Sequence, residues 1–314
     1  MIWLIIKTID LKERIWTEAK NRYLILLWLL TILFVAFSKK SGVYVVILTA
    51  PFLLIYLRKY TRALIPVLIA FIVGLGIYYG GEYAIENVWD IGNDDTKEIY
   101  SIPFQQTARF VRDFGDDVTA EERQIIDKVL DYNALPDLYN PELCDPVKNS
   151  FKEESTDEDF SEYLGVWFSQ LFKHPTVYIQ ATLNNIYGYF YPENIGYYKD
   201  LFFMTQCVDE NKIFAPGGLK EASEKLCDIN MKSRKLPVIG LFSSLGFFVW
   251  LDILVMLYFM LYKKNRKFII YNIPVLITLL TCIASPVNNT MRYGLPIMFM
   301  APILFCMCFK NEEE

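Results

Sequence analysis

Two blocks of apolar residues, at about 23–80 and 237–309, enclose a polar segment, and this pattern limits most strongly what the chain can fold into. The polar segment, residues 81–236, holds 15 Lys and Arg against 29 Asp and Glu, whereas the rest of the chain holds 16 against 7. The whole chain is 54% hydrophobic, which is high for a soluble protein. The pattern predicts a membrane protein that carries one large acidic domain outside the bilayer.

Six apolar stretches within the two blocks read as helices in the bilayer. They are residues 23–37, 43–57, 63–80, 237–262, 268–285 and 293–309. A spanning helix needs about 20 apolar residues, because lipid cannot satisfy the backbone groups of other structures. The first two stretches are short and close together, so they form either two tilted spans or a re-entrant hairpin. We predict an all-α integral membrane protein with about six transmembrane helices and a mostly helical extracytoplasmic domain inserted between helices 3 and 4.

Basic residues in short loops predict the orientation of these spans. They flank the expected cytoplasmic ends: Lys12, Arg14, Lys20, Arg22, Arg58, Lys59, Arg62, Lys263, Lys264, Arg266, Lys267 and Lys310. Both termini are therefore expected in the cytoplasm and residues 81–236 outside the cell. The predicted order is a cytoplasmic amphipathic segment at 1–22, transmembrane helices at 23–80, the acidic domain at 81–236, transmembrane helices at 237–309 and a tail at 310–314. In the first segment, five side chains are expected to lie against lipid headgroups: Ile2, Leu4, Ile5, Ile9 and Trp16.

The acidic domain carries several helix signals. A capping box at Thr119–Glu122 predicts a helix to about residue 131, and further helices are expected from near Thr156, from Pro175 to Tyr187, and over 219–231. Residues 90–104, 132–155 and 191–216 read as loops. Three cysteines are expected outside the membrane, Cys144, Cys207 and Cys227. Cys207 and Cys227 are candidates for a disulfide, although the odd number argues against a framework built on disulfides alone.

Two amides and two guanidinium groups lie close together near the start of the domain. Gln105, Gln106, Arg109 and Arg112 fall in an expected external loop and suit the binding of phosphate or sugar hydroxyls, because Arg presents a bidentate fork. The alternative is the start of a helix with solvated arginines.

Three more basic residues are expected at the outer membrane surface. Arg292 and Tyr293 follow a tight turn before the last span, where Arg292 suits either a lipid-linked phosphate or an ordinary headgroup. Lys39 and Lys40 break the rule that places basic residues inside. All three therefore point to an anion at this surface.

Acidic residues provide the candidates for general base catalysis. Glu82, Glu86 and Asp90 are spaced four residues apart, on one helical face just outside the third span. They suit a general base with a metal, or a solvated acidic face. Asp252 lies inside an expected span, where charge is costly; it is either functional or protonated and bonded to a neighbouring helix. His174 is the only histidine, which excludes a multi-histidine metal site, and it is expected to cap a helix end.

Aromatic residues crowd the region 187–203. Such residues form a domain core or an interfacial belt, and aromatic faces also stack on sugar rings. No nucleotide-binding, zinc-protease or serine-hydrolase motif is found in the sequence, and nothing in it suggests a nucleic acid as partner.

Several short motifs in a fixed order resemble an uncharacterised family of multi-pass membrane proteins from Firmicutes. The motifs are Ser101–Arg109, Thr119–Glu122, Tyr139–Pro141, Asp145–Lys148, Lys173–Pro175, Tyr191–Pro192 and Ser285–Tyr293. That family looks like the GT-C-type glycosyltransferases, which take sugar from a polyprenyl-phosphate donor outside the membrane. Residues 38–42 match a loop that usually carries Arg-Asn-Asn-Gly, so Lys39 departs from an expected Arg.

The resemblance implies the C-terminal half of a larger glycosyltransferase for cell-surface glycans. Enzymes of that type carry their catalytic acid in a first external loop that has no counterpart in this chain, so an N-terminal partner chain is an alternative source of it. The implied partners are membrane lipids, a polyprenyl-phosphate sugar and a glycan acceptor. The donor phosphate would lie near Lys39, Lys40, Arg109 and Arg292, and no cofactor is implied. A non-catalytic subunit that binds glycan or lipid is the second hypothesis, and a transporter that uses Asp252 is the third.

Overall fold

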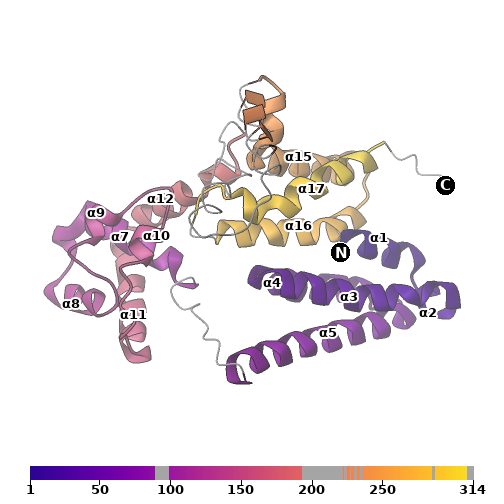
Figure 1. The fold of residues 1–314 in the computed structure, drawn as a ribbon, viewed down its shortest axis with the longest axis horizontal. Coiled ribbons are helices and arrows are strands. Elements are labelled where there is room, and N and C mark those ends of the chain that lie inside the picture. Colours follow the sequence, from indigo (N-terminus) through magenta and orange to yellow (C-terminus); the bar gives the residue numbers. More distant parts are fainter. Residues whose placement is uncertain are drawn as a thin grey trace. The chain divides into compact units, whose positions relative to one another are not determined.

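Every regular element is a helix in the part of the chain that the computed structural model describes, which confirms the all-helical prediction (Figure 1). The described residues are 1–88, 99–192, 236–284 and 287–309, with isolated residues between 222 and 233. The chain forms two compact units. The first is Met1–Asp94, Leu251–Thr281 and Phe299–Glu314, and the second is Asp95–Trp250 and Cys282–Met298.

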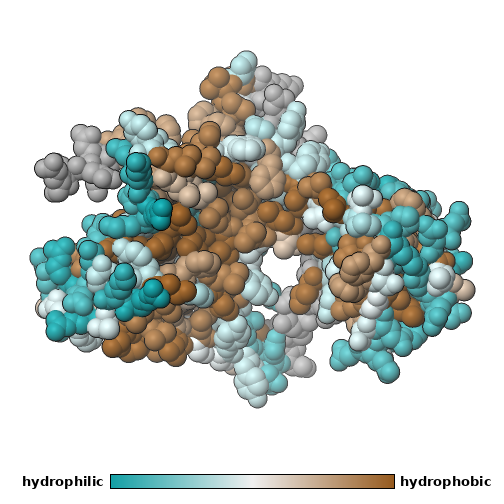
Figure 2. Space-filling model, turned by 180° about the vertical axis from the view of Figure 1, so that it is seen from behind, coloured by the Kyte–Doolittle hydropathy of each residue, from teal (hydrophilic) through white to brown (hydrophobic). Residues whose placement is uncertain are grey.

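The first unit is built on long apolar helices. Its elements begin with α1 (Ile2–Leu11), α2 (Arg14–Thr17), η1 (Ala19–Asn21), α3 (Tyr23–Ser38), α4 (Lys40–Leu57) and α5 (Thr61–Val88). Three later helices contribute residues to both units: α15 (Leu245–Leu257), continued by the π-helix η5 (Tyr258–Tyr262), α16 (Lys267–Ile283) and α17 (Met291–Met307). Brown, apolar side chains cover much of the first unit in Figure 2, as expected of helices that face lipid.

Four of the described helices are long and apolar enough to cross a membrane. They are Ala19–Ser38, Lys40–Leu57, Thr61–Val88 and Leu245–Tyr262. The two remaining apolar helices, α16 and α17, have 17 residues each, which corresponds to about 26 Å at 1.5 Å per residue. This is slightly less than the apolar thickness of about 30 Å. These four candidate spans fit a membrane protein, and six spans remain a prediction.

A close contact between backbones joins α3 to α4. The Gly42 amide donates to the Lys39 carbonyl at 2.7 Å, and a Cβ atom on Gly42 would lie 2.0 Å from the Val35 carbonyl oxygen. Only glycine fits such an approach. The two short stretches at the start of the chain therefore form a tightly packed helical pair, and each helix is long enough to be a span.

The N-terminal helix α1 packs inside the first unit rather than on lipid. Ile2, Leu4, Ile5 and Ile9 are at most 4% exposed, and Thr8 accepts a hydrogen bond from Trp28 Nε1 of α3 at 2.9 Å. The prediction that these side chains lie against headgroups was wrong, because the amphipathic period is the same for a helix on lipid and one on protein. Trp16, which is exposed, is the exception.

The second unit contains the acidic domain. Its helices are α7 (Ser101–Phe114), η2 (Gly115–Asp117), α8 (Ala120–Val129), α9 (Leu135–Leu138), α10 (Asp145–Lys148), α11 (Asp157–Lys173) and α12 (Pro175–Ile186), followed by η3 (Tyr187–Tyr189). Phe104 lies at the centre of the core, with ring contacts to Phe151, Phe160 and Tyr163. The predicted loop at 90–104 was wrong in its last residues, since α7 begins at Ser101, and the predicted loop at 132–155 contains α9 and α10.

Local signals placed the other helices of the domain correctly. Thr119 with Glu122, and Thr156 with Asp159, form complete capping boxes at the starts of α8 and α11. Pro175 opens α12 in its first turn, as predicted. Several predictions concern residues outside the described ranges: most of the helix at 219–231, the loop at 191–216, the disulfide between Cys207 and Cys227, Asp90, and the aromatic residues after 192.

Asp159 in the capping box of α11 contributes to the stability of the fold, and this contribution depends on pH. Hydrogen bonds from the side chain and backbone of Thr156, and then Lys128, lower the pKa of Asp159 from 3.8 to about 2. A lowered pKa stabilises the fold above the unfolded value, and this stabilisation is lost as the pH falls from 3.8 towards 2. In Asp159→Asn we expect this part of the pH dependence to vanish from thermal unfolding of the full chain in detergent. Asp157→Asn, which removes the same charge outside the capping box, should retain it.

Candidate functional site

Helix α7 carries four of the predicted binding residues and lies against several other helices of the acidic domain. Gln105 and Gln106 are almost fully buried, at 2% and 8% exposure. Arg109 and Arg112 lie one turn and two turns further along. The structure therefore brings these residues together on a helix inside the domain. This confirms the alternative prediction of a helix start rather than the loop, although Arg109, at 12% side-chain exposure, is not solvated as that alternative had it.

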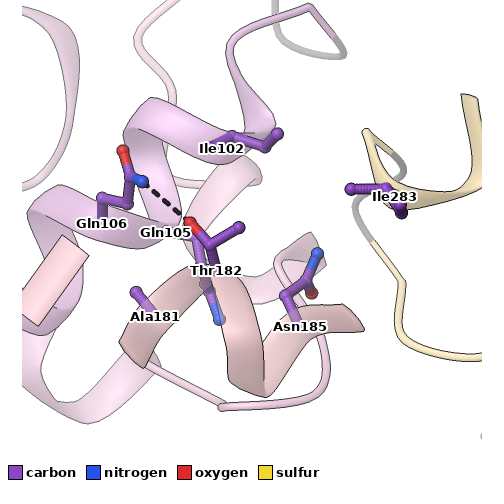
Figure 3. A pocket seen from close by; sticks show the side chains of 7 residues that line it. All are labelled: Ile102, Gln105, Gln106, Ala181, Thr182, Asn185 and Ile283. Atoms are coloured by element: carbon purple, nitrogen blue, oxygen red, sulfur yellow. Dashed lines mark hydrogen bonds between the residues drawn. The ribbon is translucent and has the colours of Figure 1, made fainter. Parts of the chain in front are cut away.

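The amide of Gln106 is fully used in joining three helices. Its Nε2 donates to Thr182 Oγ1 of α12 at 2.9 Å (Figure 3), and more weakly to the Tyr178 carbonyl at 3.4 Å. Its Oε1 accepts from Trp167 Nε1 of α11 at 2.9 Å. Gln106 therefore acts as a polar link in the core.

Gln105 has one polar atom, its Oε1, that can accept a further hydrogen bond. Its Nε2 donates to the Asn140 carbonyl, whereas its Oε1 is buried and has no hydrogen-bond partner among the described residues. A buried carbonyl oxygen without a partner is costly, and a hydrogen bond from a bound water or ligand would remove that cost. Gln105 is therefore the predicted residue best suited to accept a hydrogen bond from a bound molecule.

A small pocket lies beside these two amides. Figure 3 shows its lining, which comes from α7, from α12 and from the end of the apolar helix α16: Ile102, Gln105, Gln106, Ala181, Thr182, Asn185 and Ile283. Its volume is about 10 Å³, which is room for one water-sized group. Amides and a hydroxyl beside isoleucine side chains suit one hydroxyl group of a ligand. Thr182 and Asn185 were missed by the sequence reasoning, because they lie on α12, about 80 residues from Gln105.

The guanidinium of Arg109 is engaged inside the domain. Its Nη2 donates to Gln180 Oε1 at 2.6 Å and its Nη1 to the Tyr139 hydroxyl at 3.3 Å, while Nε lies 3.3 Å from Asp113 Oδ2. The side chain is 12% exposed. These contacts make Arg109 a link between α7, α12 and Tyr139, and its binding of phosphate remains a prediction.

Arg112 is more accessible than Arg109. It lies over the Tyr139 ring at 4.3 Å, and its Nε bonds to Asp113 Oδ1 at 2.8 Å. This hydrogen bond is the largest cause that lowers the pKa of the Asp113 carboxyl below its ordinary value. The pair therefore stays ionised under ordinary conditions, with the side chain of Arg112 36% exposed.

The turn between α16 and α17 is fastened to the acidic domain through η3. The Tyr189 hydroxyl donates to the Val287 carbonyl at 2.9 Å and accepts from the Thr290 amide at 3.3 Å. The Gly188 amide donates to Asn288 Oδ1 at 2.9 Å. Residues 287–291 are buried as a result. Asn288, which begins a formal glycosylation sequence, is 2% exposed and inaccessible to a glycan in this fold.

Arg292 follows this buried turn and is exposed at the start of α17. Its guanidinium lies over the Tyr293 ring at 5.0 Å and donates from Nη2 to the Tyr293 hydroxyl at 3.1 Å. A guanidinium held against an aromatic ring is oriented while its remaining N–H groups can reach a ligand. Both residues belong to the second unit, as Gln105 does.

The other predicted site residues belong to the first unit. Lys39 and Lys40 lie at the turn from α3 to α4, and both interact within the chain. Glu82 and Glu86 lie in the last turns of α5. This helix has 28 residues, or about 42 Å at 1.5 Å per residue, so it is longer than the bilayer core of about 30 Å. The gathering of all these residues into one site remains a prediction.

His174 has a structural environment. Its ring stacks on Phe114 with centroids 3.9 Å apart, and its Nε2 lies 2.7 Å from Asp117 Oδ2. It lies where α11 ends and α12 begins, which confirms its predicted place at a helix end. Among the residues described, no group of three His, Cys, Asp or Glu side chains is placed to hold a metal ion.

Comparison with known proteins adds a family. No curated protein matches the chain. No solved structure matches it either. The sequence profile of a family of unknown function, DUF6020, matches residues 1–314, which is the full length. The chain, with its four candidate membrane spans, therefore belongs to this family of unknown function, DUF6020.

Proposed function

We propose that this protein acts on a polyprenyl-phosphate-linked sugar at the outer surface of the cell membrane, as part of a GT-C-like glycosyltransferase. One observation carries the proposal: the pocket at Gln105 is lined both by helices of the acidic domain and by Ile283, at the end of an apolar helix. The proposal includes six spans, cytoplasmic termini and an extracytoplasmic domain at residues 81–236.

A lipid-linked sugar has an apolar part and a polar part, and the lining of this pocket likewise contains both apolar and polar side chains. Its prenyl chain needs an apolar helix surface, and its sugar hydroxyls need amide and hydroxyl partners. Gln105 Oε1 would accept a hydrogen bond from one sugar hydroxyl. A volume of about 10 Å³ admits that hydroxyl rather than the whole ring, so the rest of the sugar would lie outside the pocket.

The donor phosphate would bind Arg292. This side chain is exposed and is oriented by Tyr293, and a guanidinium forms strong bidentate bonds to phosphate. Lys39 and Lys40 would add positive charge, and Glu82 or Glu86 would act as the general base that deprotonates the acceptor hydroxyl. Asp90 is the third candidate base.

A non-catalytic subunit that binds glycan or lipid is the second candidate. It is favoured by the chemistry of the pocket, whose lining residues include amides and a hydroxyl but no carboxylate. Such a site binds a sugar but offers no group to deprotonate an acceptor. A transporter role has less support, since one oxygen of Asp252 is already bonded to Asn272.

The proposal can be tested by binding and transfer with the full chain in nanodiscs. The probe is polyprenyl-phosphate glucose, with glucose phosphate as the lipid-free comparison. Arg292→Ala should weaken binding at least tenfold, because a hydrogen bond to a charged group is worth about 1.5–3 kcal/mol, and Gln105→Leu should weaken it less. Arg123→Ala is the matched control, since Arg123 lies in the same unit, pairs with Asn133 and lies over the Tyr132 ring.

Three outcomes separate the hypotheses. With a cell-surface glycan added as acceptor, transfer of the glucosyl group to a glycan hydroxyl releases polyprenyl phosphate; loss of this release in Glu82→Gln or Glu86→Gln, with binding retained, supports the enzyme. Binding without any transfer supports the non-catalytic subunit. If the probe does not bind, or if Arg292→Ala and Arg123→Ala bind it equally well, the use of Arg292 for a lipid-linked phosphate is wrong.

A further inference from the structure

Asp252 and Asn272 form an isolated polar pair inside the first unit. Asp252 lies on α15, a candidate span, and Asn272 lies on the apolar helix α16. They are 3% and 0% exposed. Asn272 Nδ2 donates a hydrogen bond to Asp252 Oδ2 at 2.8 Å. The pair is independent of the pocket at Gln105 and of any sugar chemistry.

This single hydrogen bond leaves one oxygen atom of each side chain without a partner. Asp252 Oδ1 and Asn272 Oδ1 are both buried, and neither has a hydrogen-bond partner among the described residues. An ionised carboxylate and an amide oxygen can only accept hydrogen bonds. In the described ranges no Lys, Arg or His forms an ion pair with Asp252. A charge in this setting would be uncompensated, which is costly inside a membrane.

One added proton would supply the missing hydrogen bond between these two oxygens. A protonated carboxyl group has one O–H donor and keeps an acceptor oxygen. A carboxylic acid and a primary amide can form a planar cyclic pair. In this pair one amide N–H donates to one carboxyl oxygen, and the second carboxyl oxygen lies beside the amide oxygen. A proton on Asp252 Oδ1 would then donate to Asn272 Oδ1, while Oδ2 continues to accept from Nδ2.

We propose that Asp252 and Asn272 form a proton-binding site within the membrane, in which the neutral acid and the amide make two reciprocal hydrogen bonds that fasten α15 to α16. The ligand is one proton rather than a metal ion. Ca²⁺ and Mg²⁺ take about six or more oxygen ligands, and this pair offers two free oxygens. Bound in this way, the proton converts two unsatisfied acceptors into a closed pair and removes the charge.

Infrared spectroscopy of the full chain in nanodiscs tests the protonation state. The protonated carboxyl of Asp252 should contribute a C=O stretching band, distinct from the bands of ionised carboxylates. In the difference spectrum between the wild-type chain and Asp252→Asn, the loss of this acid band is the expected result. The loss of carboxylate bands instead would overturn the proposal.

Thermal unfolding of three variants tests the reciprocal pair independently. Asp252→Asn replaces the neutral acid with an amide of the same shape that also donates one bond and accepts one, so its unfolding temperature should equal that of the wild type. Asn272→Leu removes both bonds and should lower it clearly. Asp252→Leu combined with Asn272→Leu leaves no polar group unsatisfied and should recover part of the loss. If Asp252→Asn lowers the unfolding temperature as much as Asn272→Leu, or fails to fold, the site holds a carboxylate and the proposal is wrong.

Discussion

Replacing Gly42 by alanine is expected to separate α3 from α4 and to destabilise the first unit by about 3 kcal/mol or more. The new methyl group would lie 2.0 Å from the Val35 carbonyl oxygen. Because that atom belongs to the backbone of a helix, no side-chain rotation relieves the clash, and the two helices must move apart. Overpacking typically costs about 1–3 kcal/mol, and occasionally more.

Gly76→Ala is the matched control for this prediction. A Cβ atom on Gly76, in α5, would meet no atom within 4 Å, and alanine favours a helix over glycine. The measurement is the unfolding temperature of both variants in the same detergent. Equal stability of the two variants would show that the close approach of α3 and α4 does not exist.

Replacing Tyr189 by phenylalanine is expected to release the turn between α16 and α17. The hydroxyl is buried, and its loss removes the acceptor of the Thr290 amide and the shorter of two hydrogen bonds to the Val287 carbonyl, which keeps the Thr290 hydroxyl as a donor at 3.4 Å. A buried polar group without a partner costs about 1–3 kcal/mol, so we expect a loss of this size from the Thr290 amide and a smaller one from the Val287 carbonyl. Amide hydrogen exchange in the full chain should accelerate at residues 287–292 before it does in α8.

The neighbouring Tyr187 supplies a control with the same chemical change. Its hydroxyl bonds to the Glu142 carboxylate, and its side chain is 41% exposed, so water can replace that bond in Tyr187→Phe. Exchange at residues 287–292 should then remain slow. If both variants behave alike, the turn is held by other contacts. Because Arg292 directly follows the turn, Tyr189→Phe should also weaken binding of a lipid-linked phosphate under the proposed function.

Elements with strong local signals were predicted well from the sequence. The capping residues Thr119 and Thr156, together with Pro175, act within one helical turn, so they mark helix starts without knowledge of the tertiary structure. Helix α7 was only partly predicted. Pro103 and the run of polar residues from Gln105 to Thr107 resemble a loop, although Phe104 and Ala108 repeat with helical spacing.

The candidate site was predicted less well, because its contacts connect distant parts of the chain. Gln105 and Gln106 were recognised as polar residues of interest, but their buried environment comes from α12. The role of Tyr189 depends on acceptors and donors that are 98 and 101 residues away. The burial of Ile2 and Ile9 is another such case, since sequence periodicity does not identify what a helix face contacts.

The attachment of η3 to the turn before α17 also bears on biosynthesis. The core around Phe104 uses residues 104–166, so it can assemble soon after these residues have been synthesised. The partners of Tyr189 leave the ribosome about 100 residues later. Contacts between such distant residues form late, so the hydrogen bonds of Gly188 and Tyr189 to the turn before α17 can form only after that turn has been synthesised. The synthesis of α16 and α17 is therefore the step that completes the second unit, and any defect in the packing of these helices would leave an incomplete surface exposed to proteases.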